Sequence, residues 1–350
     1  MTRAFTIASI VLASALVGCS GDDDSDKTPT DTSDTPSETG DSGTTVTGAV
    51  WEEAFVYEGP GALSGVWGSG ADDVWMVGGT TDAGEIFHFD GTDWTEVAAP
   101  ADTPLLVWVY GFGPDDVWSV GLDGAVVHYD GSTWTSLDSG TTEDLWGVFG
   151  FGTDDLWIVG GFADTTPDPV VLHFDGTDFT PYTLTAKENE RGATTMFKVW
   201  GYDQNSLFMV GQRGQINQWT GTNWAYSGAG PNADQDFVSL WGTSADNIVA
   251  VGGRGNGRIA TWDGSAWDTL QPGGVGGLNA VTMLDPNTAV VGGINGYVGV
   301  FDVTTGELTT EYAPTTIDVH ALWHDGADTT YGVSGRFLAP YGGTALKRTE

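Results

Sequence analysis

A repeated stretch decides the fold, and its clearest copy reads VWGSGADDVWMVGGTTDAGEIFHFDGTDWTEV over residues 66–97. The next copy, VYGFGPDDVWSVGLDGAVVHYDGSTWTSL, starts at Val109, and five more start at Val148, Val199, Leu240, Val281 and Leu322. A central valine marks the period: Val77, Val120, Val159, Val210, Val251, Val291 and Val333. Successive markers are 43, 39, 51, 41, 40 and 42 residues apart, which matches the length of one four-stranded propeller blade.

Each copy divides into four short strands, a to d, at turn signals. In the first copy strand a ends near Trp67, strand b covers residues 74–77, strand c covers residues 85–89 and strand d contains Trp94. Asp90-Gly91 predicts a tight hairpin between c and d, because this pair tolerates positive φ. Strands b and c are nearly continuous apolar runs, which indicates burial on both faces, as between packed blades. We therefore expect an all-β fold, a seven-bladed β-propeller over residues 49–350.

The two ends of this domain complement each other. The seventh copy stops after a third strand at residues 344–348, and the segment 50–56 has no strands a to c before it. Trp51 lies 16 residues before Trp67, the spacing that also separates Trp94 from Tyr110. We therefore expect the N-terminal strand to serve as strand d of the last blade and to close the ring. Closure pairs sheet edges that would otherwise invite aggregation.

The repeat resembles known propeller families. The apolar run followed by Gly78-Gly79, Phe89 and Trp94 resembles a kelch repeat, although the spacing and the Asp-Gly turn depart from the kelch pattern. The copies also resemble the DDVW…VG…HxDGxxW repeats of bacterial lipoproteins. The resemblance implies the fold but not the function, because propellers include enzymes, lectins, receptors and scaffolds.

The N-terminus is typical of an export signal. Arg3 precedes a mainly apolar run over residues 5–16, which is too short to span a membrane. The sequence Leu16-Val17-Gly18-Cys19 then resembles a bacterial lipobox. This resemblance implies that residues 1–18 are a signal peptide and that Cys19 receives a diacylglycerol, with several acyl chains giving stable anchoring. The alternative is a secretory signal with an incidental cysteine.

Ser20 follows Cys19, at a position where lipoproteins retained at an inner membrane often carry Asp. We therefore expect an outer-membrane lipoprotein, on either the periplasmic or the external side. Residues 19–48 are almost wholly Ser, Thr, Asp, Gly and Pro, which predicts a disordered acidic tether. Thirty such residues reach ~100 Å when fully extended.

Charge and cysteine content exclude several classes of function. Acidic residues number 48 against 11 Lys and Arg, so the formal charge of −37 opposes binding to nucleic acid. The single Cys excludes an intrachain disulfide framework and a Cys-cluster metal site. No P-loop, dinucleotide fingerprint, HExxH or Ser/His/Asp motif is present, so we expect neither a cofactor nor catalysis.

Residues that recur in each copy are expected to be structural. His88, His128 and His173 share one strand-c position in successive blades, which is too far apart for a shared zinc ion, so we expect half-buried rings with satisfied nitrogens. The paired acids before strand b, such as Asp72-Asp73, are expected to cap turns through backbone N–H groups, with calcium binding as the alternative. The tryptophans are expected to pack between blades, and a role in sugar stacking would need exposure.

Departures from the repeat indicate the functional face. The b–c and d–a connections share one face of the ring and vary in length, as at residues 162–169 and 181–196, and variable loops on a rigid scaffold commonly bind ligands. Six of the nine basic residues in the domain map to this face: Arg213, Arg254, Arg336, Arg258, Arg191 and Lys187. They suggest a site for a carboxylate, sulfate or phosphate group. The alternative is that each base neutralises nearby acids such as Asp236.

These patterns predict a cell-envelope lipoprotein whose propeller is a non-catalytic binding scaffold. Its expected ligand is a protein or an envelope polymer on the face of the b–c and d–a connections. One alternative is a lectin-like binder of acidic carbohydrate. A weaker one is a glycan-acting enzyme, since sialidase propellers also use clustered arginines, but their Ser-x-Asp-x-Gly-x-Thr-Trp box is absent here.

Overall fold

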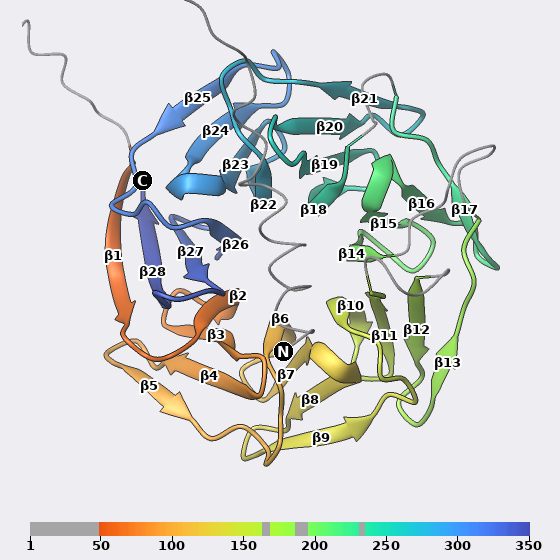
Figure 1. Ribbon diagram of the computed structural model, residues 1–350. Coiled ribbons are helices and arrows are strands. Elements are labelled where there is room, and N and C mark those ends of the chain that lie inside the picture. The colour runs from red at the N-terminus through yellow and green to blue at the C-terminus, as the bar shows by residue number, and fades with distance from the viewer. Residues whose placement is uncertain (1–48, 163–168, 186–194, 231–234) are drawn as a thin grey trace, which may run out of the picture.

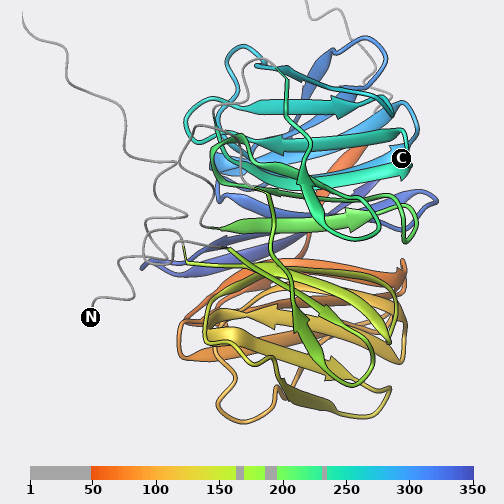
Figure 2. The same cartoon turned by 90° about the vertical axis from the view of Figure 1, so that its right-hand side faces the viewer.

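The computed structural model describes residues 49–162, 169–185, 195–230 and 235–350. These residues form seven four-stranded antiparallel sheets that stand as blades around a central axis (Figure 1). The predicted seven-bladed β-propeller is therefore confirmed. Seen from the side, the strands run between the two faces of the ring, where the connections lie (Figure 2).

Strands a to d of each blade follow one another outward from the axis. Blade 1 contains β2 (Ala62–Gly70), β3 (Asp73–Thr80), β4 (Ala83–Phe89) and β5 (Trp94–Val97). Blade 2 contains β6 (Leu106–Gly113), β7 (Asp116–Gly121), β8 (Ala125–Tyr129) and β9 (Trp134–Asp138). Blade 3 contains β10 (Leu145–Gly152), β11 (Asp155–Gly160), β12 (Val170–Phe174) and β13 (Phe179–Pro181). Blade 4 contains β14 (Met196–Gly201), β15 (Leu207–Gly211), β16 (Ile216–Trp219) and β17 (Trp224–Tyr226).

The remaining blades repeat this order. Blade 5 contains β18 (Phe237–Ser244), β19 (Asn247–Gly252), β20 (Arg258–Trp262) and β21 (Trp267–Leu270). Blade 6 contains β22 (Leu278–Asp285), β23 (Thr288–Gly293), β24 (Val298–Asp302) and β25 (Leu308–Glu311). Blade 7 contains β26 (Val319–His324), β27 (Thr329–Arg336), β28 (Gly342–Thr349) and, as its outermost strand, β1 (Val50–Tyr57). The helices in the described ranges are three three-residue turns, η1 (Leu122–Gly124), η2 (Gln212–Gly214) and η3 (Ile294–Gly296), and none is long and apolar enough to cross a membrane.

The second strand of each blade is buried along almost its whole length. β15 is buried at every residue, and β3 at every residue except its two ends. Strand d is far more exposed, as in β5. Apolar side chains of adjacent blades form continuous clusters, for example between Trp75 of blade 1 and Trp134 of blade 2. The continuous apolar runs in the sequence therefore reflect packing on both sides of each central strand.

The N-terminal strand closes the ring. β1 is antiparallel to β28, with Trp51 opposite Arg348 and Tyr57 opposite Gly343. In Figure 1 the orange-red strand β1 lies at the rim beside the dark-blue strand β28. The predicted role of Trp51 as a strand-d residue is confirmed.

The c–d turns are longer than a two-residue hairpin. Phe89 pairs with Trp94, so four residues connect them, with Gly91 at a φ of 89°. Oδ1 of Asp90 accepts the backbone N–H groups of Thr92 and Asp93, each at 2.9 Å. The aspartate therefore caps the turn with its side chain while the glycine takes the left-handed conformation.

Candidate functional site: the central pocket

One residue of every innermost strand is forced out of the ladder toward the axis. In blade 1 the register between β2 and β3 shifts between Leu63 and Gly65, so Ser64 is an unpaired bulge residue. The same shift recurs in the six other blades. The seven bulge residues are Ser64, Val107, Trp146, Phe197, Val238, Asn279 and His320. A bulge re-aims its side chain, and all seven line one central pocket.

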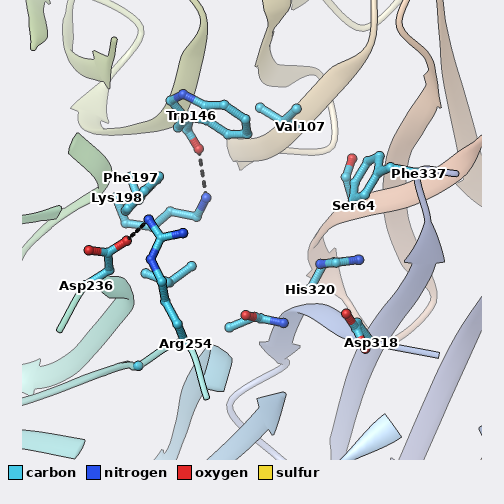
Figure 3. Close-up of a pocket in the computed structure, with 13 residues that line it drawn as sticks. Ser64, Val107, Trp146, Phe197, Lys198, Asp236, Arg254, Asp318, His320 and Phe337 are labelled. Carbon is cyan, nitrogen blue, oxygen red and sulfur yellow. Dashed lines mark hydrogen bonds and ion pairs between the residues drawn. The ribbon is translucent and has the colours of Figure 1, made fainter. Parts of the chain in front are cut away.

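The central pocket has a volume of about 820 Å³ when the solvent space at its open mouth is counted. Six further residues complete its lining: Lys198, Asp236, Gly253, Arg254, Asp318 and Phe337. Most of these lie beside the start of a strand a or just after a strand b, so the pocket opens toward the b–c and d–a connections. This is the face on which the sequence predicted the site. Figure 3 shows Trp146, Lys198 and Arg254 on one side of the pocket and Ser64, His320 and Phe337 on the other.

Lys198 places an amine in this pocket from strand β14. Its Nζ donates to the carbonyl oxygen of Trp146 at 2.7 Å and lies 4.0 Å from the centroid of the Trp108 ring. Burial lowers the pKa of Lys198 to about 7, because desolvation disfavours the charged form. The amine is therefore poised between its neutral and charged forms near neutral pH.

Arg254 lies beside Lys198 and is paired with an acid. Its Nη2 donates to Oδ2 of Asp236 at 2.5 Å. Oδ1 of Asp236 accepts the backbone N–H of Arg213, at 2.9 Å, from the preceding blade. Arg213 has a φ of 56°, so this carboxylate also supports a left-handed turn in η2. Asp236 thereby joins blades 4 and 5 at the pocket wall.

His320 faces these groups from blade 7. Its Nε2 lies 2.8 Å from the carbonyl oxygen of Gly335 and therefore donates to it, and its ring packs 5.0 Å from that of Phe337. Burial lowers the pKa of His320, and the positive charge of Lys198 acts in the same direction, while Asp318 opposes both. Oδ1 of Asp318 in turn accepts the backbone N–H of Asn295 at 2.7 Å.

The predicted arginine set is only partly brought together. Arg254 lines the central pocket, and Arg213 shares Asp236 with it. Arg258 is buried, with Nη1 donating to the backbone carbonyls of Asn256 and Gly257 at 3.3 and 3.2 Å. Arg336 is exposed at the end of β27. Lys187 and Arg191 lie outside the described residues. Most of the two long connections, residues 162–169 and 181–196, also lies outside them.

Lys198 and the bulge residues were missed by the sequence prediction. The binding residues were expected on the b–c and d–a connections, whereas Lys198 and the bulge residues lie within strand a of their blades. One signal was present, because the positions equivalent to Lys198 carry uncharged residues: Gly65, Trp108, Gly147, Ser239, Ala280 and Ala321.

The ring nitrogens of the strand-c histidines are satisfied as expected, and their partners are the acids that begin strand b. Nε2 of His128 lies 2.8 Å from Oδ1 of Asp116, and the His128 ring stacks on Trp118 at 4.1 Å. Matching units are formed by His88 with Asp73 and by His173 with Asp155. The second acid of each pair therefore orients a histidine rather than capping a turn, which corrects the interpretation from sequence. Among the described residues, no group of three or more His, Cys, Asp or Glu side chains is arranged to hold a metal ion.

Fold and pocket together define a seven-bladed β-propeller with an axial cavity. No protein-family model matches the chain, and no curated protein matches it. Among solved structures, YCF48 bound to D1 peptide is 14% identical with a TM-score of 0.61, covering 86% of this chain and 96% of that one. YCF48 from Cyanidioschyzon merolae is 13% identical, with a TM-score of 0.62 and coverage of 85% and 98%. The WD40 β-propeller domain of Doa1 is 11% identical, with a TM-score of 0.66 and coverage of 86% and 98%. At these sequence identities the similarity shows the fold alone.

Proposed function

We propose that this protein is a lipid-anchored, non-catalytic binding protein of the bacterial envelope whose central pocket holds a polypeptide or envelope polymer. The bulge residues carry this proposal. They occupy one structurally repeated position, yet they include a serine, two valines, a tryptophan, a phenylalanine, an asparagine and a histidine. The residue before each bulge is apolar and buried in every blade, whereas the bulge position varies, so the repeat is broken where a ligand would touch the protein.

The composition of the pocket suits a ligand with apolar and polar groups. Trp146, Phe197 and Phe337 provide aromatic walls, and Lys198 and Asn279 add polar groups beside them. Pockets that bind ligands commonly combine apolar walls with a few placed polar groups. YCF48, a propeller of similar fold, has been solved with a peptide. That example supports a polypeptide ligand.

A capture experiment tests the binding role. The full chain, purified in detergent and immobilised, is expected to retain a ligand from envelope extract of the source cells. Trp146→Ala combined with Phe337→Ala should reduce retention at least tenfold, because aromatic anchors dominate interface energetics. The control is Tyr202→Ala, which removes an exposed aromatic from the connection between β14 and β15 on the opposite face. Equal retention by both variants would contradict the proposal.

The anchor is tested separately. Cys19→Ser should abolish incorporation of labelled palmitate and shift the protein from the detergent phase to the aqueous phase on phase separation. Unlabelled wild-type protein would point to a secretory signal instead. Fractionation of outer and inner membranes then tests the expected location.

Acidic carbohydrate is the second candidate ligand. Arg254 and the partly exposed Trp146 line the same pocket, and a charged group beside an aromatic face suits a sugar with a carboxylate. In that case Arg213→Ala with Arg254→Ala abolishes binding on an array of acidic glycans. Unchanged binding by the double variant would reject this alternative.

A further inference from the structure

We propose that the central pocket recognises a carboxylate attached to an apolar group, with Lys198 as the residue that binds the carboxylate. This inference rests on the proposed binding function and names the chemistry of its ligand. The ligand is either a free carboxylic acid or the last residue of a polypeptide, which share this chemistry.

The first reason is a missing counter-charge. The chain has 48 acidic residues, yet within the described ranges no carboxylate contacts the Lys198 amine, which touches the Trp146 carbonyl and the Trp108 ring. Two other bases of the domain are paired with acids, Arg254 with Asp236 and Arg348 with Glu311. A cation in a partly closed cavity is costly without an opposite charge, so a bound anion would supply what the protein omits.

The second reason is that the acids of the pocket are already engaged. Asp236 accepts Arg254 on one oxygen and the Arg213 backbone on the other. Asp318 accepts the backbone N–H of Asn295. Neither competes for Lys198, and an ammonium group retains further donors after the bond to Trp146.

The third reason is the apolar surface next to the amine. Phe197 precedes Lys198 in β14, Trp146 accepts its hydrogen bond, and Phe337 stands across the pocket (Figure 3). A carboxylate on Lys198 would therefore carry its adjoining group against aromatic side chains. An uncharged or strongly hydrophilic ligand would leave this surface unused.

The same geometry couples ligand binding to the protonation of Lys198. The groups facing Lys198 are Arg254 and Asp236 from blade 5 and His320 and Asp318 from blade 7. A carboxylate favours the ammonium form of Lys198 and so raises its pKa above about 7. Binding above that pH must therefore take up protons, up to one per site, and affinity must fall as the pH rises from 6 to 9.

Calorimetry with the full chain in detergent tests the proposal. N-acetyl-phenylalanine is expected to bind at least tenfold more tightly than N-acetyl-phenylalaninamide at pH 6.5. Lys198→Met should abolish this difference, since methionine keeps the apolar stem without the charge. Lys347→Met is the matched control. Lys347 is on β28, outside the pocket, and its amine lies over the ring of Tyr331. Thermal melting verifies that both variants fold.

Titration at pH 8 in two buffers of different ionisation enthalpy measures the proton uptake. Uptake by the wild type and by Lys347→Met, with none in Lys198→Met, is the expected result. Equal affinity for acid and amide, or unchanged uptake in Lys198→Met, would overturn the proposal. Tighter binding of galacturonate than of N-acetyl-phenylalanine would overturn its apolar part.

Peptides that end in phenylalanine, with free or amidated C-termini, distinguish the two sources of carboxylate. Preference for the free peptide supports a polypeptide end, whereas binding of N-acetyl-phenylalanine without any peptide supports a small acid and removes the polypeptide role. Equal binding of both peptides, lost in Trp146→Ala, would retain the proposed function and overturn the carboxylate site.

Discussion

Arg348 and Glu311 form a double ion pair between blade 7 and blade 6, next to the strand pair that closes the ring. Nε and Nη2 of Arg348, on β28, lie 3.0 Å from Oε2 and Oε1 of Glu311, on the outer strand of blade 6. The same carboxylate accepts the indole N–H of Trp51, from the closing strand β1, at 2.7 Å. Glu311 thus binds both strands whose pairing closes the propeller.

Glu311→Gln is expected to lower the free energy of unfolding by about 2–4 kcal/mol, because it leaves the buried Arg348 guanidinium without its main counter-charge. Urea denaturation measures the change. Glu350, which also contacts Arg348, is 47% exposed, so Glu350→Gln should cost less than about 1 kcal/mol. An equal decrease in the free energy of unfolding in the two variants would show that the closing strand pair β1–β28 does not depend on Glu311.

Asp116→Ala is expected to destabilise the protein by ~1–3 kcal/mol. The carboxylate accepts the Trp118 indole N–H at 2.9 Å and the His128 ring nitrogen at 2.8 Å, and both lose their partner. The adjacent Asp115 is exposed, so Asp115→Ala should change stability by no more than about 0.5 kcal/mol. Tryptophan fluorescence during urea unfolding distinguishes the two, and a comparable effect at Asp115 would argue against the Trp–His–Asp unit.

Lys198→Met is expected to stabilise the unliganded protein by ~1–3 kcal/mol at pH 7, although it abolishes the preference for a carboxylate ligand. The folded pKa of about 7 lies below the ordinary value of 10.5, so the unfolded chain binds more protons between these values. The free energy of unfolding of the wild type therefore rises with pH across this window. The difference in unfolding free energy between Lys198→Met and the wild type should shrink toward pH 10. A pH-independent difference in unfolding free energy would contradict a depressed lysine pKa.

Gly124→Ala and Gly140→Ala separate backbone strain from steric overlap. The two glycines have φ values of 75° and 73°, but a Cβ at Gly124 would overlap the Thr141 carbonyl whereas one at Gly140 meets open space. Gly140→Ala should cost about 1 kcal/mol, the usual strain of a left-handed residue, and Gly124→Ala at least about 2 kcal/mol more. Similar melting temperatures for both variants would contradict the geometry of η1.

The sequence was sufficient for the architecture because blade packing imposes the same demands seven times. The b and c strands needed apolar residues on both faces, and the spacing of Trp51 revealed the closing strand. Register was harder to predict where the pattern is ambiguous. In blade 6 the residue equivalent to Val77 of blade 1 is Gly292, and not Val291 as the repeat pattern suggested. The strand pairing shows this, because Gly293 pairs with Leu278 as Gly78 pairs with Leu63.

The site was predicted only in part because its key feature is a backbone irregularity. The variable face was identified from loop lengths, and Arg254 lies there. A bulge adds one residue to a strand without altering the types of residue in it. The amino-acid pattern therefore did not indicate that Trp146 or His320 faces the axis. The charge on Lys198 was visible, but its position became informative only once β14 was known to border the pocket.

Each bulge residue lies outside the ladder of backbone hydrogen bonds in its blade, so its side chain can reach the axis. Some of these side chains also contact the next blade, as Ser64 does through a 2.6 Å hydrogen bond from Oγ to the Leu106 carbonyl and as Trp146 does through its ring contact with Phe197. Seven such positions, one per blade, surround a single cavity. Substitution at these positions therefore changes the lining of the cavity directly, at a cost in stability set by the contacts that each side chain makes with the neighbouring blade.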